Sequence, residues 1–194
     1  MSDIIRTDLL LSQSAFRQTV KAPIYRVDIA TWLFHLPEAE YQRCCIPDHI
    51  AAGYTSSDDG RPMSINVEMI GSGLVIQHYV GEITEKRYCK MVSTSDVFSA
   101  DGRSRVQVIW ELRMEAADRE RCEYTNTVTA HPTEEFLDFI KTHGIPFEQA
   151  SRDRQAAFGD HNRRETPHFA ESIARAAVAQ NQPTEWRNHV PVPT

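Results

Sequence analysis

Residues 105–114 of this 194-residue chain have the sequence RVQVIWELRM, in which apolar and polar side chains alternate. Alternation with a period of two is typical of a β-strand that turns one face to a core. The apolar positions on the shared face are Val106, Val108, Trp110, Leu112 and Met114. We therefore predict a long strand here, with this face in the hydrophobic core.

The segments around this stretch predict more strands of the same kind. Residues 65–69, 74–83, 87–98 and 121–129 have extended patterns with apolar side chains at alternate positions. Glycine-containing turns such as Ala100-Asp101-Gly102 separate them. Because connections this short join antiparallel neighbours, we predict a meander of about five antiparallel strands.

The residues before the meander predict one further strand. Residues 24–29 alternate, which places Tyr25, Val27 and Ile29 on one face. The nearly continuous apolar run 30–36 fits either a buried continuation of this strand or the start of a helix.

Pro37 suits the first turn of a short helix over residues 38–45. We expect residues 1–20 to form a loosely attached N-terminal arm, residues 21–182 to form a single α+β domain, and residues 183–194 to form a C-terminal tail. A chain of this length is sufficient for one large core.

The chemistry of the chain changes after the meander. Residues 131–135 predict the start of a helix, and residues 146–180 are helical in composition. Gly159 and Pro167 interrupt this second segment. Thr166 before Pro167 has the pattern of a fresh helix start, so we expect two helices or one kinked helix.

Composition and charge narrow the class of protein. The formal net charge is −6 and no basic stripe is present, which argues against nucleic acid as a partner. The chain contains neither a signal-peptide pattern nor the roughly 18 apolar residues of a membrane helix. We expect a cytoplasmic protein with no membrane association. Its four cysteines lack metal or redox spacing and are expected to be buried free thiols.

The order of elements is a strand, short helices, an antiparallel meander and a long helical region, with the stretch Leu36-Pro37-Glu38-Ala39-Glu40-Tyr41 after the first strand. This order resembles the helix-grip fold of the START and Bet v 1-like (SRPBCC) superfamily, which includes polyketide cyclases. The resemblance implies a curved sheet wrapped on a long C-terminal helix. It also implies an internal cavity that holds a small hydrophobic molecule.

The sharpest chemical pattern is carried by His161, Glu165 and His168. On one continuous helix, steps of four and three residues place the three side chains on one side. Two histidines and a carboxylate suit iron or zinc, so this trio is a candidate metal site. The same segment is also compatible with a polar helix surface, or with a non-metal role for His161 in the cavity.

His78 is a second catalytic candidate, because it shares a strand face with Leu74, Ile76 and Val80. An imidazole on an inward face can act as a general acid or base near neutral pH. The alternative is a core histidine with one hydrogen-bond partner. Large aromatic residues are predicted either to pack in the core or to form the walls of a ligand cavity: Trp110, Tyr124, Tyr88 and Phe158.

Our first hypothesis is a domain that binds a small hydrophobic or aromatic molecule and transforms it by acid–base chemistry through His78 or His161, without a cofactor. The second is a metal-dependent hydrolase or oxygenase that uses His161 and Glu165. The third is a non-enzymatic interaction protein that forms a homodimer. Signature motifs for nucleotide binding and for serine or zinc hydrolases are absent.

Overall fold

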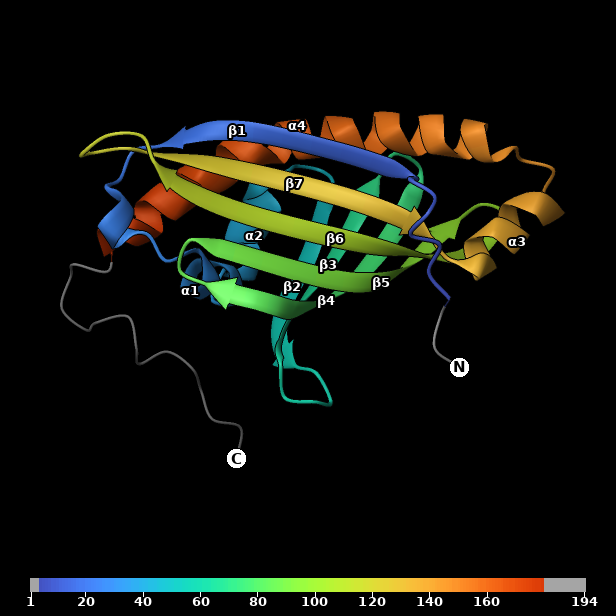
Figure 1. Ribbon diagram of the computed structural model, residues 1–194, viewed down its shortest axis with the longest axis horizontal. Helices are drawn as coiled ribbons and strands as arrows, with labels where there is room; N and C mark the ends of the chain where they lie inside the picture. Colours follow the sequence, from blue (N-terminus) through green and yellow to red (C-terminus); the bar gives the residue numbers. More distant parts are fainter. Residues whose placement is uncertain (1–3, 180–194) are drawn as a thin grey trace.

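The computed structural model describes residues 4–179, so the predicted tail lies outside the described part of the chain. Seven antiparallel strands form one sheet in the order β1-β7-β6-β5-β4-β3-β2 (Figure 1). They are β1 (Ser12–Val20), β2 (His49–Ser56), β3 (Pro62–Ile70), β4 (Gly73–Glu85), β5 (Tyr88–Ser99), β6 (Gly102–Ala116) and β7 (Cys122–Pro132).

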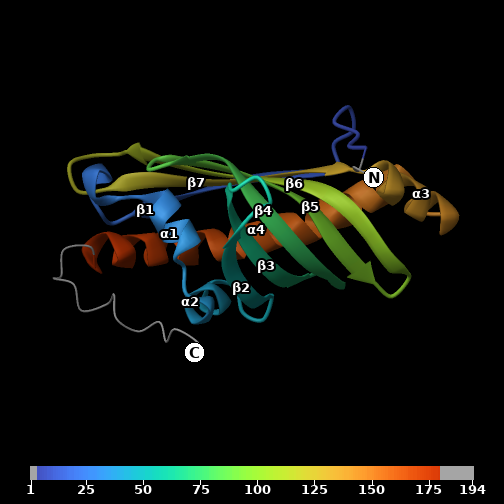
Figure 2. The ribbon, with the colours of Figure 1, turned by 90° about the horizontal axis from the view of Figure 1, so that it is seen from below.

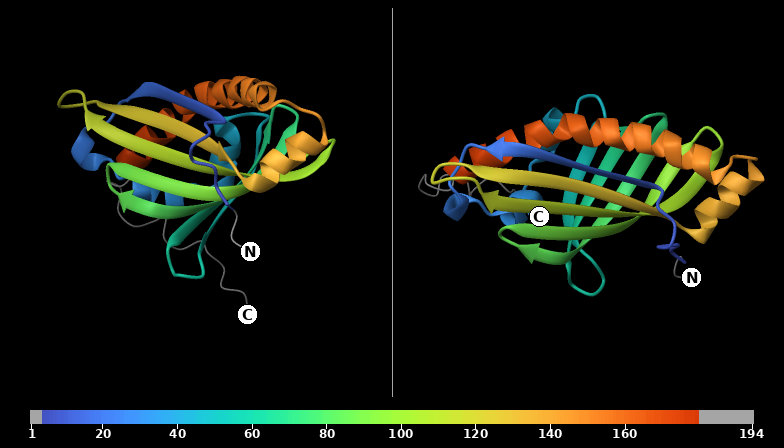
Figure 3. Two further views of the ribbon diagram at one scale, coloured as in Figure 1. Left: turned by 45° about the vertical axis from the view of Figure 1, so that its right-hand side comes forward. Right: turned by 45° about the horizontal axis from the view of Figure 1, so that its top comes forward.

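The helices are the 3-10 turn η1 (Ile24–Arg26), α1 (Ile29–Phe34), α2 (Glu38–Cys44), α3 (Glu134–Thr142) and α4 (Phe147–Ala179). Figure 2 shows the sheet curving around α4, which crosses its concave side. Figure 3 shows α3 at one end of the molecule, beside the first turns of α4. This α+β architecture is of the helix-grip type, as predicted.

The five predicted strands of the meander correspond to β3–β7. Val106, Val108, Trp110, Leu112 and Met114 are all buried, which confirms the core face predicted for β6. The turn that joins β5 and β6 is also where the sequence places it. Gly102 has a φ of 130°, a conformation that side chains with a Cβ rarely adopt.

The first twenty residues differ from the prediction of a loose arm, because Ser12–Val20 pair along their whole length with β7. The side chain of Gln155 in α4 also holds this strand. Its Oε1 accepts from the backbone N–H of Gln13 at 2.9 Å, and its Nε2 donates to the carbonyl of Gln13 at 3.0 Å. The predicted strand over residues 24–29 is wrong.

Local hydrogen bonding explains that error. Ile24–Arg26 form the turn η1, and the Asp28 carboxylate then accepts from the backbone N–H of Thr31, which caps α1. The apolar run 30–36 is therefore largely helical. Strand β2 was not predicted.

Helix α4 is continuous over 33 residues and contains Pro167. The predicted fresh helix start at Thr166 is absent, because the Thr166 hydroxyl donates to the carbonyl of Asn162 one turn earlier within the helix. Burial of both residues holds this segment against the sheet. Among the described residues, no helix has both the length and the apolar character that a membrane span needs.

Candidate functional site

Buried polar side chains gather where the middle of α4 faces β2, β3 and β7. We call this group the polar cluster; its members are Tyr41, Asp48, His49, Glu68, Asn126, His161 and Glu165, all buried. The turn after α2 supplies Asp48, and the first residue of β2 is His49. Glu68 points inward from β3. His161 and Glu165 are one turn apart on α4, as the sequence predicted.

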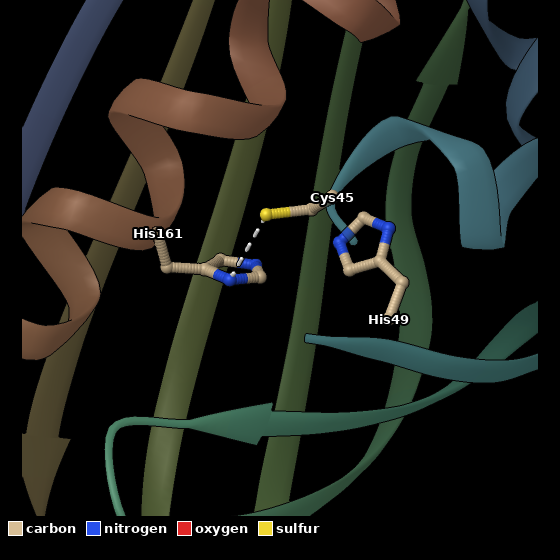
Figure 4. Close-up of side chains that lie close together, drawn as sticks. All are labelled: Cys45, His49 and His161. Atoms are coloured by element: carbon tan, nitrogen blue, oxygen red, sulfur yellow. Dashed lines mark hydrogen bonds between the residues drawn. The ribbon is translucent and has the colours of Figure 1, made fainter. Parts of the chain in front are cut away.

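Two imidazoles and two carboxylates face one another in the cluster. His49 Nε2 lies 3.2 Å and His161 Nε2 lies 3.4 Å from the same oxygen, Glu165 Oε2. The same two nitrogens each lie 3.8 Å from a carboxylate oxygen of Glu68. Figure 4 shows the two imidazoles near each other, with the Cys45 thiol beside His161. Cys45 Sγ is 3.6 Å from His161 Nδ1.

Surrounding groups fix the direction in which each side chain points. His49 Nδ1 donates to the carbonyl of Tyr41 at 2.7 Å, and His161 Nδ1 donates to Asp48 Oδ2 at 2.9 Å. Both rings therefore direct Nε2 at the carboxylates. Glu165 Oε1 accepts from the Asn126 amide at 3.0 Å. Glu68 accepts from the Tyr41 hydroxyl.

These contacts shift the pKa of the charged groups. Burial by itself raises the pKa of Glu165, but hydrogen bonds and positive charge from His161 and His49 outweigh it and hold the pKa at about 2. Burial lowers the pKa of His161, but its contacts with Cys45 and Glu165 outweigh burial and raise the pKa to about 12. Glu165 is thus a carboxylate paired with the imidazolium of His161.

Two neighbouring cavities lie between the sheet and α4. The first has a volume of about 20 Å³, enough for a water molecule, and Glu68, His161 and Glu165 form part of its wall. The second, which we call the α3 pocket, has a volume of about 240 Å³ and lies between α3, the β4 and β5 strand ends and the first half of α4. Ile70 and Phe158 line both cavities and form the partition between them.

Arg154 places a positive charge in the largely apolar wall of the α3 pocket. Its Nε and Nη2 atoms are buried and have no hydrogen-bond partner among the described residues. The guanidinium lies 4.8 Å from the ring centre of Phe158 and 5.9 Å from that of Phe136. Burial lowers the pKa of Arg154 to about 10, which still leaves it charged at neutral pH.

The predicted site residues divide into two groups. Trp110 and Phe158 line the small cavity together with His161 and Glu165. Tyr124 is buried but lines neither of the two cavities.

The remaining candidates point away from the interior. The His168 side chain is 56% exposed and lies beside Glu171, so the structure does not bring it to His161 and Glu165. Tyr88 is on the sheet face away from α4, where its hydroxyl bonds to Glu111. His78 is exposed, because the buried positions of β4 are Val75, Gln77 and Tyr79.

Several members of the site were missed by sequence reasoning. His49, Asp48 and Tyr41 lie in segments with no recognised motif. Glu68 alternates with apolar neighbours and has the pattern of a solvent-facing position, yet it is 5% exposed. Arg154 lies in a charged run of the helix. Its step of four to Phe158 is the one sequence signal that could have placed it beside an apolar wall.

Comparison with known proteins supports the architecture. No protein-family model matches this sequence, and no curated protein matches it either. The Zhui aromatase/cyclase from Streptomyces is similar in structure, with a TM-score of 0.58 and 12% identity over 89% of this chain and 97% of that one. A START superfamily protein from Mycobacterium smegmatis has a TM-score of 0.54 and 9% identity over 87% of this chain and 98% of that one.

A third similar structure is the di-domain ARO/CYC protein StfQ from the steffimycin biosynthetic pathway. Its TM-score is 0.53 and its identity 10%, over 87% of this chain and 53% of that one. Identities this low show a shared fold alone. The chain shares the helix-grip fold of these structures, as its order of elements predicted.

Proposed function

We propose that this chain binds a small molecule with an apolar body and one anionic group, and that the molecule occupies the α3 pocket. The observation that carries the proposal is in the wall of that pocket: Arg154 Nε and Nη2 are buried and have no hydrogen-bond partner among the described residues. Buried N–H donors without an acceptor are costly, and a ligand anion would supply the missing acceptor.

The walls of the pocket define the rest of the ligand. Most of them are apolar, from the sheet and from both helices: Ile70, Val75, Val97, Phe136, Phe139, Ile140, Ile145 and Phe158. Its volume is near the lower end for small-molecule sites, which are roughly 300–1,000 Å³. An apolar body fills such walls, and a carboxylate matches the planar fork of a guanidinium.

Two acidic side chains also line the pocket, but they do not replace the ligand anion. Asp101 and Asp153 are exposed, so water screens their charges. Neither carboxylate forms a hydrogen bond with Nε or Nη2 of Arg154. The buried donors of Arg154 thus favour a ligand that directs its anionic end at them.

The fold adds support from another direction. Aromatase/cyclases share this architecture. Chemistry on a bound molecule would take place where the ligand extends past Ile70 and Phe158 and contacts the polar cluster. Acid–base chemistry through His161 is the less favoured alternative. An imidazolium with a pKa of about 12 holds its proton too firmly to act as a general acid at neutral pH. The homodimer stays a prediction, which sedimentation would test.

The experiment compares apolar carboxylic acids with their methyl esters by isothermal titration calorimetry. We expect each acid to bind at least about tenfold more tightly than its ester, since charged hydrogen bonds contribute about 1.5–3 kcal/mol. Arg154→Gln should abolish the difference between acid and ester. Arg152→Gln is the matched control, because Arg152 is exposed two positions earlier in the same helix.

A second variant separates the pocket from the charge. Ala150→Trp places a large ring in the pocket and should weaken acid and ester alike. Acids and esters that bind equally well to the wild-type protein, or acid binding that survives Arg154→Gln unchanged, would contradict the proposal.

A further inference from the structure

We propose that the polar cluster is a binding site for a divalent transition-metal ion, with His49, His161, Glu68 and Glu165 as its ligands. The argument is independent of the α3 pocket, because no residue of the ligand set lines that pocket. The four side chains come from β2, β3 and α4.

The separations between donor atoms fit a metal centre. With metal–ligand bonds of about 2.1 Å, the donors of a tetrahedral site lie about 3.4 Å apart. His49 Nε2 and His161 Nε2 lie 3.2 and 3.4 Å from Glu165 Oε2. Both nitrogens lie 3.8 Å from oxygens of Glu68. A small movement of Glu68 towards the two imidazoles would bring its donor atoms to the same separation.

The outer contacts are those that orient metal ligands. A histidine that binds a metal through one ring nitrogen usually donates from the other to a carboxylate or a backbone carbonyl. His161 donates in this way to Asp48, and His49 donates to the carbonyl of Tyr41. Each carboxylate likewise has an outer donor, Asn126 for Glu165 and Tyr41 for Glu68.

The two imidazoles lie close enough to share one ion, since their ring centres are 5.2 Å apart. Two imidazoles among the donors favour zinc or iron(II) over calcium or magnesium.

The neighbouring cavity leaves room for a further ligand. It opens beside Glu68, His161 and Glu165, and Gln77 also lines it. Gln77 Oε1 is buried and accepts no hydrogen bond within the described residues. A water molecule bound to the metal would supply the hydrogen-bond donor that this oxygen lacks.

Cys45 is the competing ligand. Its sulfur, a ring nitrogen of His49 and a ring nitrogen of His161 all lie within 4.8 Å of one another. Glu165 Oε2 lies 3.2 and 3.4 Å from the two Nε2 atoms, whereas Cys45 Sγ lies 3.6 Å from His161 Nδ1, the nitrogen that Asp48 holds. The geometry therefore assigns Glu68 and Glu165 to the metal and leaves Cys45 outside.

The test uses the full-length protein without an affinity tag, freed of metal with a chelator and titrated with Zn²⁺ and Co²⁺. We expect one equivalent to bind and the melting temperature to rise with metal concentration. Glu165→Gln and Glu68→Gln keep the side-chain shape and should each weaken binding by at least tenfold. His168→Ala and His78→Ala remove exposed histidines and should have no effect.

The wild-type titration decides the proposal even where a variant fails to fold. Absence of stoichiometric binding and of any metal-dependent stabilisation would overturn it. A thiolate-to-cobalt charge-transfer band would contradict the ligand set by placing Cys45 on the metal. Arg154→Gln should bind metal like the wild type, so failure of this proposal and failure of the pocket proposal give different results.

Discussion

Strands β3 and β6 of one sheet face the same helix with opposite chemistry. On β6 the inward positions are apolar, from Val106 to Met114. On β3 the inward positions include Ser64, Asn66 and Glu68, whereas Met69 is 40% exposed. Alternation in sequence thus defines two faces, and burial decides which of them is the interior. Because polar groups are costly to bury, an inward polar face indicates a site rather than a core.

The largest effect should follow from removing a charge on the inward face of β3. Glu68→Ala leaves His49 and His161 without one of the two carboxylates that they share, and breaking a buried ion pair costs about 3–5 kcal/mol. Urea unfolding measures this loss. Met69→Ala is the matched neighbour and should cost far less, since its side chain is partly in water. Equal losses for the two variants would show that the faces of β3 are assigned wrongly.

A smaller loss of stability is expected from a substitution at the boundary between the polar cavity and the apolar α3 pocket. Phe158→Ala removes the ring between the polar cavity and the α3 pocket and should cost about 3 kcal/mol, the lower end for buried phenylalanine. Joined cavities should also accept bulkier apolar acids, which competition titration measures. A loss of stability without any change in the size of ligand that binds would show that Phe158 does not divide the two cavities.

The smallest effect concerns β4. His78→Ala should change the free energy of unfolding by less than about 0.5 kcal/mol, since His78 is exposed. The sequence pattern predicted an inward imidazole, for which the loss would be larger. Chemical denaturation compares this variant with Tyr79→Ala, which removes a buried side chain. The loss of stability should be much larger for Tyr79→Ala if Tyr79 is on the inner face of β4 and His78 on the outer face.

The strands of the meander and the two C-terminal helical segments were predictable from short-range pattern and turns. The direction of the faces of β3 and β4 was not, because Ile65 and Val67 alternate with polar residues as cleanly as Val106 and Val108 do. On the outer face those apolar side chains are only partly buried. Periodicity carries no information about which face a helix covers.

The candidate site was predictable only in part. His161 and Glu165 were found because their spacing is local, but His49 and Glu165 are 116 positions apart. Contacts at that distance arise from the path of the chain, which a single sequence does not reveal. Strand β1 was missed because much of its length is exposed and its stabilising partners are β7 and Gln155.

The most direct test of the proposed function is thermal unfolding of the wild type and of Arg154→Met, each with and without an apolar carboxylate. Without ligand, Arg154→Met should be the more stable protein, because an apolar side chain replaces two buried nitrogens that have no hydrogen-bond partner among the described residues. Only the wild type should be stabilised by the carboxylate. A variant that is less stable than the wild type and that still gains stability from the carboxylate would contradict the account.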